Sequence, residues 1–247
     1  MQSGSNGNCI YVETPDVRLL FDAGISAKAA QARLVRHQRD IGDIDAVIIS
    51  HDHSDHIGSA GVFQRRINCP LYVTAGAWKA RRTRLGSVTS KHHFEPGQAI
   101  RFSATTVQTI PTAHDGIAGV AFVISHAGKK LGIFTDLGHR FQGIESWISD
   151  LDVLYLESNY DPEMLMKGPY PLWLQRRIMG QGGHLSNQEA AELVRDSASR
   201  LRLLILAHIS QHNNHPELAL ATVQNVVKPN LPIALSSRSR ETEMFVV

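Results

Sequence analysis

The sequence contains little cysteine and no long apolar stretch. Cys9 and Cys69 are its only cysteines and form no Cys-x-x-Cys spacing, which excludes a disulfide-stapled scaffold and a cysteine-based zinc finger. The most apolar internal run, LLILA at 203–207, is far shorter than the about 20 residues that cross a bilayer. The N-terminal MQSGSNGNCIYVE lacks the cationic and apolar regions of a signal peptide. We therefore expect a cytoplasmic protein with no membrane partner.

The chain also lacks a strong net charge. Its 25 Lys and Arg against 23 Asp and Glu leave a formal charge of +2, so a nucleic acid would have to be held by a local patch or by metal. Histidine is abundant instead, with 13 residues, which points to metal or acid–base chemistry. No linker, repeat or charge block divides the 247 residues. We therefore predict one domain over residues 1–247.

Short aliphatic or β-branched runs alternate with helical patterns, which is typical of a layered α/β domain. We expect strands at 9–13, 17–22, 45–50, 70–74, 104–110, 119–125, 130–135, 152–157, 202–207 and 232–236. We expect helices at about 26–38, 54–66, 75–83, 141–148, 161–166, 171–179, 186–199 and 215–227. The first two strands flank the turn TPD and should pair as an antiparallel hairpin. Asp161, the capping box SNQE at 186–189 and His215 each precede an expected helix.

Candidate metal ligands follow several of the expected strands. VIISHDHSDHIGSAG, residues 47–61, places three histidines and two aspartates in positions 51–56. His114, Asp136 and His208 follow three other apolar runs, and layered α/β proteins collect functional groups at the carboxyl ends of strands. One histidine after a strand is more often structural. Four strands that each deliver His or Asp at this point indicate a metal site instead.

Imidazole and carboxylate ligands without thiolate suit Zn²⁺, Mn²⁺ or Fe²⁺. The candidates exceed what one tetrahedral ion needs: His51, His53, Asp55, His56, His114, Asp136 and His208. They suit two adjacent ions, which clamp the attacking and leaving oxygens of a displacement. We therefore expect two divalent metal ions, Zn²⁺ or Mn²⁺, with Fe²⁺ as a further option.

The motif HxHxDH at 51–56, followed by lone His114, Asp136 and His208, resembles the metallo-β-lactamase superfamily. The resemblance implies the α/β fold class, as a four-layer αββα sandwich. It also implies a ligand assignment: His51, His53 and His114 for the first ion, Asp55, His56 and His208 for the second, and Asp136 as a bridge. β-Lactamases of the better-known subclass have a cysteine in place of this aspartate, so antibiotic hydrolysis is not expected.

Three further stretches, at 3–13, 156–187 and 206–219, resemble the WalJ/YycJ-type branch of stand-alone nucleases. The resemblance implies phosphodiester hydrolysis, 5′-to-3′ exonuclease activity on double-stranded DNA and a link to mismatch repair. DNA is therefore the expected partner. Asp136, with Asp55, is expected to orient the attacking water.

His184 precedes a helix N-terminus, where it could contact the phosphate or assist the leaving group. Further candidate phosphate contacts are Asn8, Asn159, Ser186, Asn187, Asn213 and Asn214. Asp22 is expected to hydrogen-bond beneath the metals.

Two other functions stay open at this point. A thioester or lactone hydrolase of the glyoxalase II or lactonase type has the same metal site, and a catalytically silent nucleic-acid- or protein-binding module can retain the fold. The basic segment KARRTR at 79–84, beside Trp78, fits either a solvated helix end or a contact with a nucleic-acid backbone. Neither the metal identity nor the oligomeric state follows from the sequence.

Overall fold

The computed structural model describes the whole chain, residues 1–247, as two compact units. The first unit comprises Met1–Pro111, Gly116–Val120 and Ser237–Val246, and the second comprises Thr112–Asp115, Ala121–Ser236 and Val247. The expected single domain over residues 1–247 stays a prediction.

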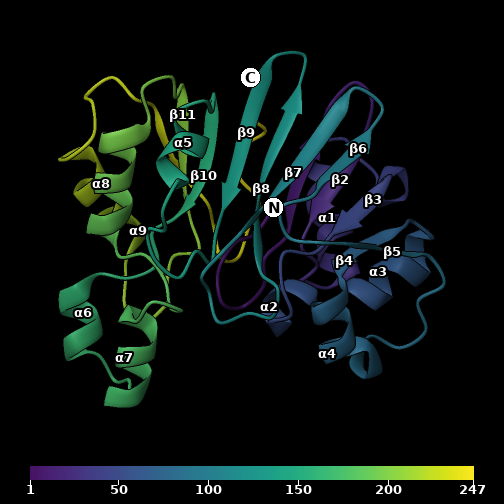
Figure 1. The fold of residues 1–247 in the computed structure, drawn as a ribbon, viewed down its shortest axis with the longest axis horizontal. Coiled ribbons are helices and arrows are strands. Elements are labelled where there is room, and N and C mark those ends of the chain that lie inside the picture. Colours follow the sequence, from purple (N-terminus) through teal and green to yellow (C-terminus); the bar gives the residue numbers. More distant parts are fainter. The chain divides into compact units, whose positions relative to one another are not determined.

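The first unit contains a five-stranded sheet and an antiparallel pair of further strands (Figure 1). Its strands are Ile10–Glu13 (β1), Arg18–Phe21 (β2), Ala46–Ile48 (β3), Leu71–Thr74 (β4), Lys91–Phe94 (β5), Ala99–Phe102 (β6) and Thr105–Pro111 (β7). Its helices are Ala27–Arg36 (α1), Ser54–Ile57 (α2), Ala60–Ile67 (α3) and Ala75–Leu85 (α4), with a 3₁₀ turn at Ile41–Asp43 (η1). The sheet order is β1-β2-β3-β4-β5. β1 and β2 form the expected antiparallel hairpin, and β2 to β5 run parallel.

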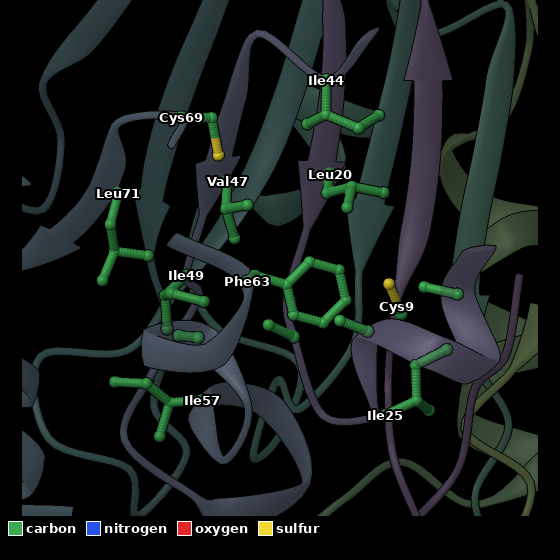
Figure 2. Packing of buried hydrophobic residues seen from close by; sticks show 14 of the residues in the cluster. Cys9, Leu20, Ile25, Ile44, Val47, Ile49, Ile57, Phe63, Cys69 and Leu71 are labelled. Carbon is green, nitrogen blue, oxygen red and sulfur yellow. The ribbon is translucent and has the colours of Figure 1, made fainter. Parts of the chain in front are cut away.

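Apolar side chains of the first unit pack between the sheet and its helices (Figure 2). Leu20, Val47 and Leu71 come from three successive strands and share a cluster with Phe63 of α3, and none is more than 1% exposed. Leu19, which points to the opposite face of the sheet, is equally buried. Strands buried on both faces need continuous apolar runs, and each such side chain contributes about 1.5–3 kcal/mol of transfer free energy.

The second unit contributes five strands of a second sheet, in the order β12-β11-β10-β9-β8. The strands are Val120–His126 (β8), Lys129–Phe134 (β9), Val153–Glu157 (β10), Leu203–Ala207 (β11) and Ile233–Leu235 (β12). The helices are Ile144–Ile148 (α5), Pro162–Lys167 (α6), Leu172–Met179 (α7), Asn187–Ser197 (α8) and Pro216–Gln224 (α9) (Figure 1). β8 and β9 are antiparallel, and β9 to β12 run parallel.

None of the helices combines the length and apolar character that a membrane crossing requires.

All ten expected strands are present, but the sequence pattern does not predict β5 or β6. β5 is an edge strand of sequence KHHF with three exposed residues, so it shows no apolar alternation. The expected helix over 54–66 is two helices, α2 and α3. Ser59 N donates to the Ala23 carbonyl at 2.8 Å, and the Asp55 carbonyl that would continue α2 accepts from Asn8 N at 2.7 Å.

The helix starts follow the expected capping residues, with a side-chain cap in two cases of three. Asp161 caps α6 through its side chain, and Ser186 forms the predicted capping box with Glu189 at the start of α8. His215 is the N-cap residue of α9, as expected, but its side chain makes no capping hydrogen bond. The Asn214 side chain accepts from His215 N at 2.9 Å instead, since Asx side chains bond readily to nearby backbone amides.

Candidate functional site

Two neighbouring parallel strands of the first unit end in polar residues. Asp22 directly follows β2, and Ser50 and His51 lie just beyond β3. Phe21 and Ile48 pair in register, so both segments leave the sheet at the same edge. Ser50 N donates to Asp22 Oδ1 at 2.8 Å, and Ser50 Oγ lies 2.9 Å from each carboxylate oxygen. The sheet register thus brings Asp22 next to the HxHxDH segment.

The HxHxDH segment itself is compact. The His51 ring centroid lies 4.7 Å from that of His53 and 4.1 Å from that of His56. α2 begins directly after His53, so Asp55 and His56 lie on its first turn. His51 and His56 are buried, whereas Asp55 is partly exposed. The structure therefore groups the four ligands that the sequence predicts in this unit.

Two glycines permit this close packing. A Cβ at Gly24 would lie 1.6 Å from the Asp55 carbonyl oxygen, and a Cβ at Gly116 would lie 2.5 Å from His51 Cδ2. A larger residue at either position would displace one of the predicted ligands.

Hydrogen bonds orient the imidazole of His56. Its Nδ1 lies 2.7 Å from Asp22 Oδ2 and 3.2 Å from Ser50 Oγ, and its Nε2 lies 2.9 Å from the Asn8 side-chain amide nitrogen. The carboxylate places the proton on Nδ1, which leaves the Nε2 lone pair to accept a hydrogen bond or bind a metal. Asp22 thus occupies the supporting position that the sequence predicts. Its φ of 64° lies in the left-handed region, where residues at functional sites concentrate.

Three adjacent parallel strands of the second unit also end in polar residues. Asp136 follows β9, Glu157 ends β10 with Asn159 just beyond it, and His208 follows β11. Glu157 pairs in register with Ala207, so these side chains leave the sheet at one edge. Asp136 and His208 have φ values of 56° and 52°, which cost a non-glycine residue about 1–2 kcal/mol.

Asp136 lies at the centre of the second group. Its Oδ1 is 3.7 Å from His114 Nε2, from His184 Nδ1 and from His208 Nδ1. His114 Nδ1 donates to the Gly183 carbonyl at 2.8 Å, which leaves Nε2 free of a proton for a metal. Two sets of possible donor atoms within this unit lie within 4.8 Å of one another: His114, Asp136 and His184, and Glu157, His184 and His208.

Glu157 is a member of this group that the sequence analysis does not single out. The side chain is fully buried, its Oε1 accepts from Leu137 N at 2.9 Å, and its Oε2 lies 3.0 Å from His184 Nδ1. It follows four apolar residues and therefore reads as the end of a strand. The signal that could have identified Glu157 is its position at the end of a strand in which every residue is buried. A carboxylate buried in this way needs hydrogen-bond or charge partners.

The residues expected to contact phosphate are at most 7% exposed: Asn8, Asn159, Ser186, Asn187, Asn213 and Asn214. Asn187 and Asn214 join through hydrogen bonds of 2.8 and 3.0 Å, and Asn159 Nδ2 donates to the His208 carbonyl at 2.8 Å. Ser186 caps α8, and Asn213 Nδ2 lies 3.5 Å from Ser210 Oγ. These bonds hold the loops around the strand ends. The role of the six residues in substrate binding stays a prediction.

Comparison with known proteins places the chain in a family. Residues 17–209 match the family model of the beta-lactamase superfamily domain. The chain belongs to the β-lactamase superfamily. It is 33% identical over 231 residues to exodeoxyribonuclease YycJ of Bacillus anthracis, over 92% of this chain and 88% of that protein. It is 35% identical over 230 residues to exodeoxyribonuclease WalJ of Streptococcus pneumoniae, over 91% and 86%.

The superfamily assignment agrees with the solved structures. The metallo-β-lactamase fold protein YhfI of Bacillus subtilis matches with a TM-score of 0.73 and 18% identity, over 96% of this chain and 94% of that chain. The predicted α/β fold class, the αββα sandwich of the metallo-β-lactamase type, is thus confirmed. The predicted placement in the WalJ/YycJ branch is confirmed as well.

The family model and the two relatives together also confirm the predicted enzyme class, a metal-dependent hydrolase. The donor set fits a divalent cation, because it combines imidazole nitrogens with carboxylate oxygens. His56 and His114 each direct their second ring nitrogen to a carboxylate or carbonyl oxygen, as metal-ligating histidines almost always do.

Proposed function

We propose that this member of the superfamily is a dinuclear metal-dependent phosphodiesterase, a 5′-to-3′ exonuclease that acts on double-stranded DNA, with a role in DNA repair. The observation that carries the proposal is Asp136, a buried carboxylate 3.7 Å from three histidine nitrogens. A carboxylate at this point, in place of cysteine, separates the chain from the better-known β-lactamases. The names of YycJ and WalJ support DNA as the substrate.

The proposed ligands are those implied by the family motif: His51, His53 and His114 for one ion, Asp55, His56 and His208 for the other, and Asp136 for both. We propose Zn²⁺ or Mn²⁺, since both accept this donor set and their availability selects between them. When bound, the ions would supply an acidified water and neutralise charge on the reacting phosphate.

The chain's own residues would position the water and the phosphate. Asp136 and Asp55 present carboxylate oxygens that can accept a proton of the attacking water and so fix its orientation. His184 is partly exposed and held by Glu157 at 3.0 Å. With its Nδ1–H donated to that carboxylate, the imidazolium form of His184 would present Nε2–H as a donor to the phosphate or the leaving oxygen. The buried Glu157 acts through His184 and is therefore a positioning residue.

Digestion of linear double-stranded DNA tests the function directly. A duplex with labelled 5′-phosphate ends is incubated with Mn²⁺ and the wild-type protein, beside Asp55→Ala prepared identically to exclude a contaminating nuclease. We expect wild type alone to release label from the 5′ ends, which establishes nuclease activity and polarity together.

An inactive, metal-loaded wild type would contradict the proposal. A panel of thioesters and lactones would then decide between its two rivals. Turnover of a small ester would favour the glyoxalase II or lactonase type, and metal binding without any hydrolysis would favour a silent binding module.

Substitutions in the His184–Glu157 pair test the positioning roles. His184→Ala should lower kcat on DNA by about 100-fold, since removal of one hydrogen-bond donor to a developing charge costs about that much. Glu157→Gln keeps the shape but turns an amide toward His184 Nδ1, and should lower kcat by about 10-fold. Both should leave KM for DNA within about threefold. Metal content is measured alongside, and an unchanged rate of His184→Ala with full metal content would remove this residue from the mechanism.

A further inference from the structure

Positive charge is concentrated in one stretch of the first unit. Residues 60–94, from the start of α3 to the end of β5, contain seven of the chain's 25 Lys and Arg and none of its 23 Asp and Glu. The rest of the chain holds 18 basic and 23 acidic residues. The small net charge of the whole protein therefore conceals a strongly basic segment in an otherwise acidic chain.

The fold gathers part of this charge on one surface, which we call the α4–β5 surface and define as Trp78, Lys79, Arg82, Lys91 and His93. β5 is the edge strand of the five-stranded sheet, and α4 follows β4, its neighbour (Figure 1). Lys91 Nζ lies 5.1 Å from the centre of the Trp78 ring, and the His93 ring lies 6.4 Å from it. Lys91 and His93 are two residues apart, so they point to the same face of β5.

The lysine and arginine side chains on this surface are not paired with carboxylates. Lys79, Arg82 and Lys91 are exposed, and none forms an ion pair with a carboxylate. Two other arginines nearby differ in this respect: Arg81 is 3.4 Å from Asp52, and Arg65 donates to the carbonyls of Leu85 and Ser87 at 2.8 Å. A solvated helix usually interleaves charges of both signs, because like charges at i,i+3 or i,i+4 repel. Several positive charges close together, with no carboxylate between them, are instead typical of a surface that binds an anionic partner.

We propose that the α4–β5 surface binds the sugar-phosphate backbone of duplex DNA outside the metal-binding groups. The inference rests on the proposed nuclease function and adds a second contact region for its substrate. Charge complementarity selects this partner, since a duplex is a line of closely spaced negative charges. The 11 residues of α4 span about 16 Å, the length of roughly five base pairs. Phosphate contacts of this kind position the duplex without reading its sequence.

The test measures the salt dependence of duplex binding. The probe is a fluorescent 30-base-pair duplex with phosphorothioate 5′ ends, titrated with Mn²⁺-loaded protein between about 50 and 200 mM salt. The triple variant Lys79→Gln, Arg82→Gln, Lys91→Gln removes three cations from exposed positions. The matched control Lys28→Gln, Lys228→Gln, Arg240→Gln makes the same change in net charge at exposed positions elsewhere.

The α4–β5 variant should reduce the slope of log K against log salt by about 2–3, since each phosphate contact contributes about 0.9. Its affinity at 100 mM salt should fall at least about 10-fold, while the control stays within about twofold of wild type. Equal slopes in wild type and the α4–β5 variant, or equal losses in both triple variants, would overturn the inference. Melting temperatures verify folding, and the double variant Lys79→Gln, Arg82→Gln carries the test if the triple variant is destabilised.

Digestion of unmodified DNA by the same wild-type preparation separates the two proposals. If wild type digests DNA and the α4–β5 variant binds the duplex with an unchanged salt slope, the nuclease function stands and the proposed role of the surface is contradicted. Wild type that neither binds nor digests DNA contradicts both. Wild type that binds through this surface without digestion supports the surface and contradicts the nuclease function.

Discussion

Asp136→Asn should abolish DNA hydrolysis while the protein stays folded. The carboxylate is 3% exposed and lies 3.7 Å from three histidine nitrogens, so its charge is central to the proposed binding of both ions. Loss of several kcal/mol of charge stabilisation corresponds to at least roughly 10³-fold in rate, at about 1.4 kcal/mol per tenfold. Asparagine is the informative replacement because it tolerates the observed φ of 56°, whereas alanine would add backbone strain.

Metal content and rate should fall together in this variant. We expect metal analysis to show fewer than two equivalents after dialysis, and the labelled-duplex assay to show no product above background. Asp196→Asn is the control, since that carboxylate makes ion pairs with Arg140 and Arg195 in the same unit. Retention of two equivalents and of a rate within tenfold of wild type would contradict the proposed bridging role of Asp136.

Asp22→Asn should weaken metal binding by about 10- to 100-fold, the usual consequence of losing an outer hydrogen bond to a metal-binding histidine. The buried carboxylate accepts from Ser50 N and Ser50 Oγ and lies 2.7 Å from His56 Nδ1. An amide nitrogen at that position would favour the opposite tautomer, with the proton on Nε2, where it blocks coordination. Asparagine again suits the backbone, because φ is 64°.

Competition with a chromogenic chelator measures this effect. Asp45→Asn is the matched control, since it makes the same charge change at the opposite end of β3 and accepts only a backbone amide, that of Arg18. The melting temperature of the metal-free protein separates the loss of metal affinity from a loss of stability, which should be about 1–3 kcal/mol. An unchanged metal affinity would show that the His56 tautomer does not depend on Asp22.

Part of the fold follows from local patterns. The ten expected strands are short apolar runs, and burial on both faces makes such runs continuous. β5 is missed because KHHF lies at a sheet edge with three exposed residues, where no apolar pattern is required. The break between α2 and α3 is missed because distant residues cause it: the carbonyls of Ala23 and Asp55 bond to Ser59 N and Asn8 N.

The same distinction applies to the candidate site. His51, His114, Asp136 and His208 are recognisable because each follows an apolar strand, a position where layered α/β proteins collect functional groups. The sequence does not identify Glu157 as a site residue, because a glutamate at the end of a strand has no distinguishing pattern until its burial is known. The burial of Asn187 and Asn214, which are 1% and 2% exposed, and the hydrogen bond between their side chains also have no local signal in the sequence.

Apolar periodicity was thus sufficient for the α/β class, because it is a local property of the chain. The family and the predicted ligands came from the resemblance that the HxHxDH motif and the later His and Asp residues carry. The orientation of those ligands is not local. Asp22 and His56 are 34 residues apart, Glu157 and His184 are 27 apart, and His114 and Gly183 are 69 apart. The hydrogen bonds that select each histidine's tautomer exist only once the strands have taken their register and the loops have folded back over the strand ends.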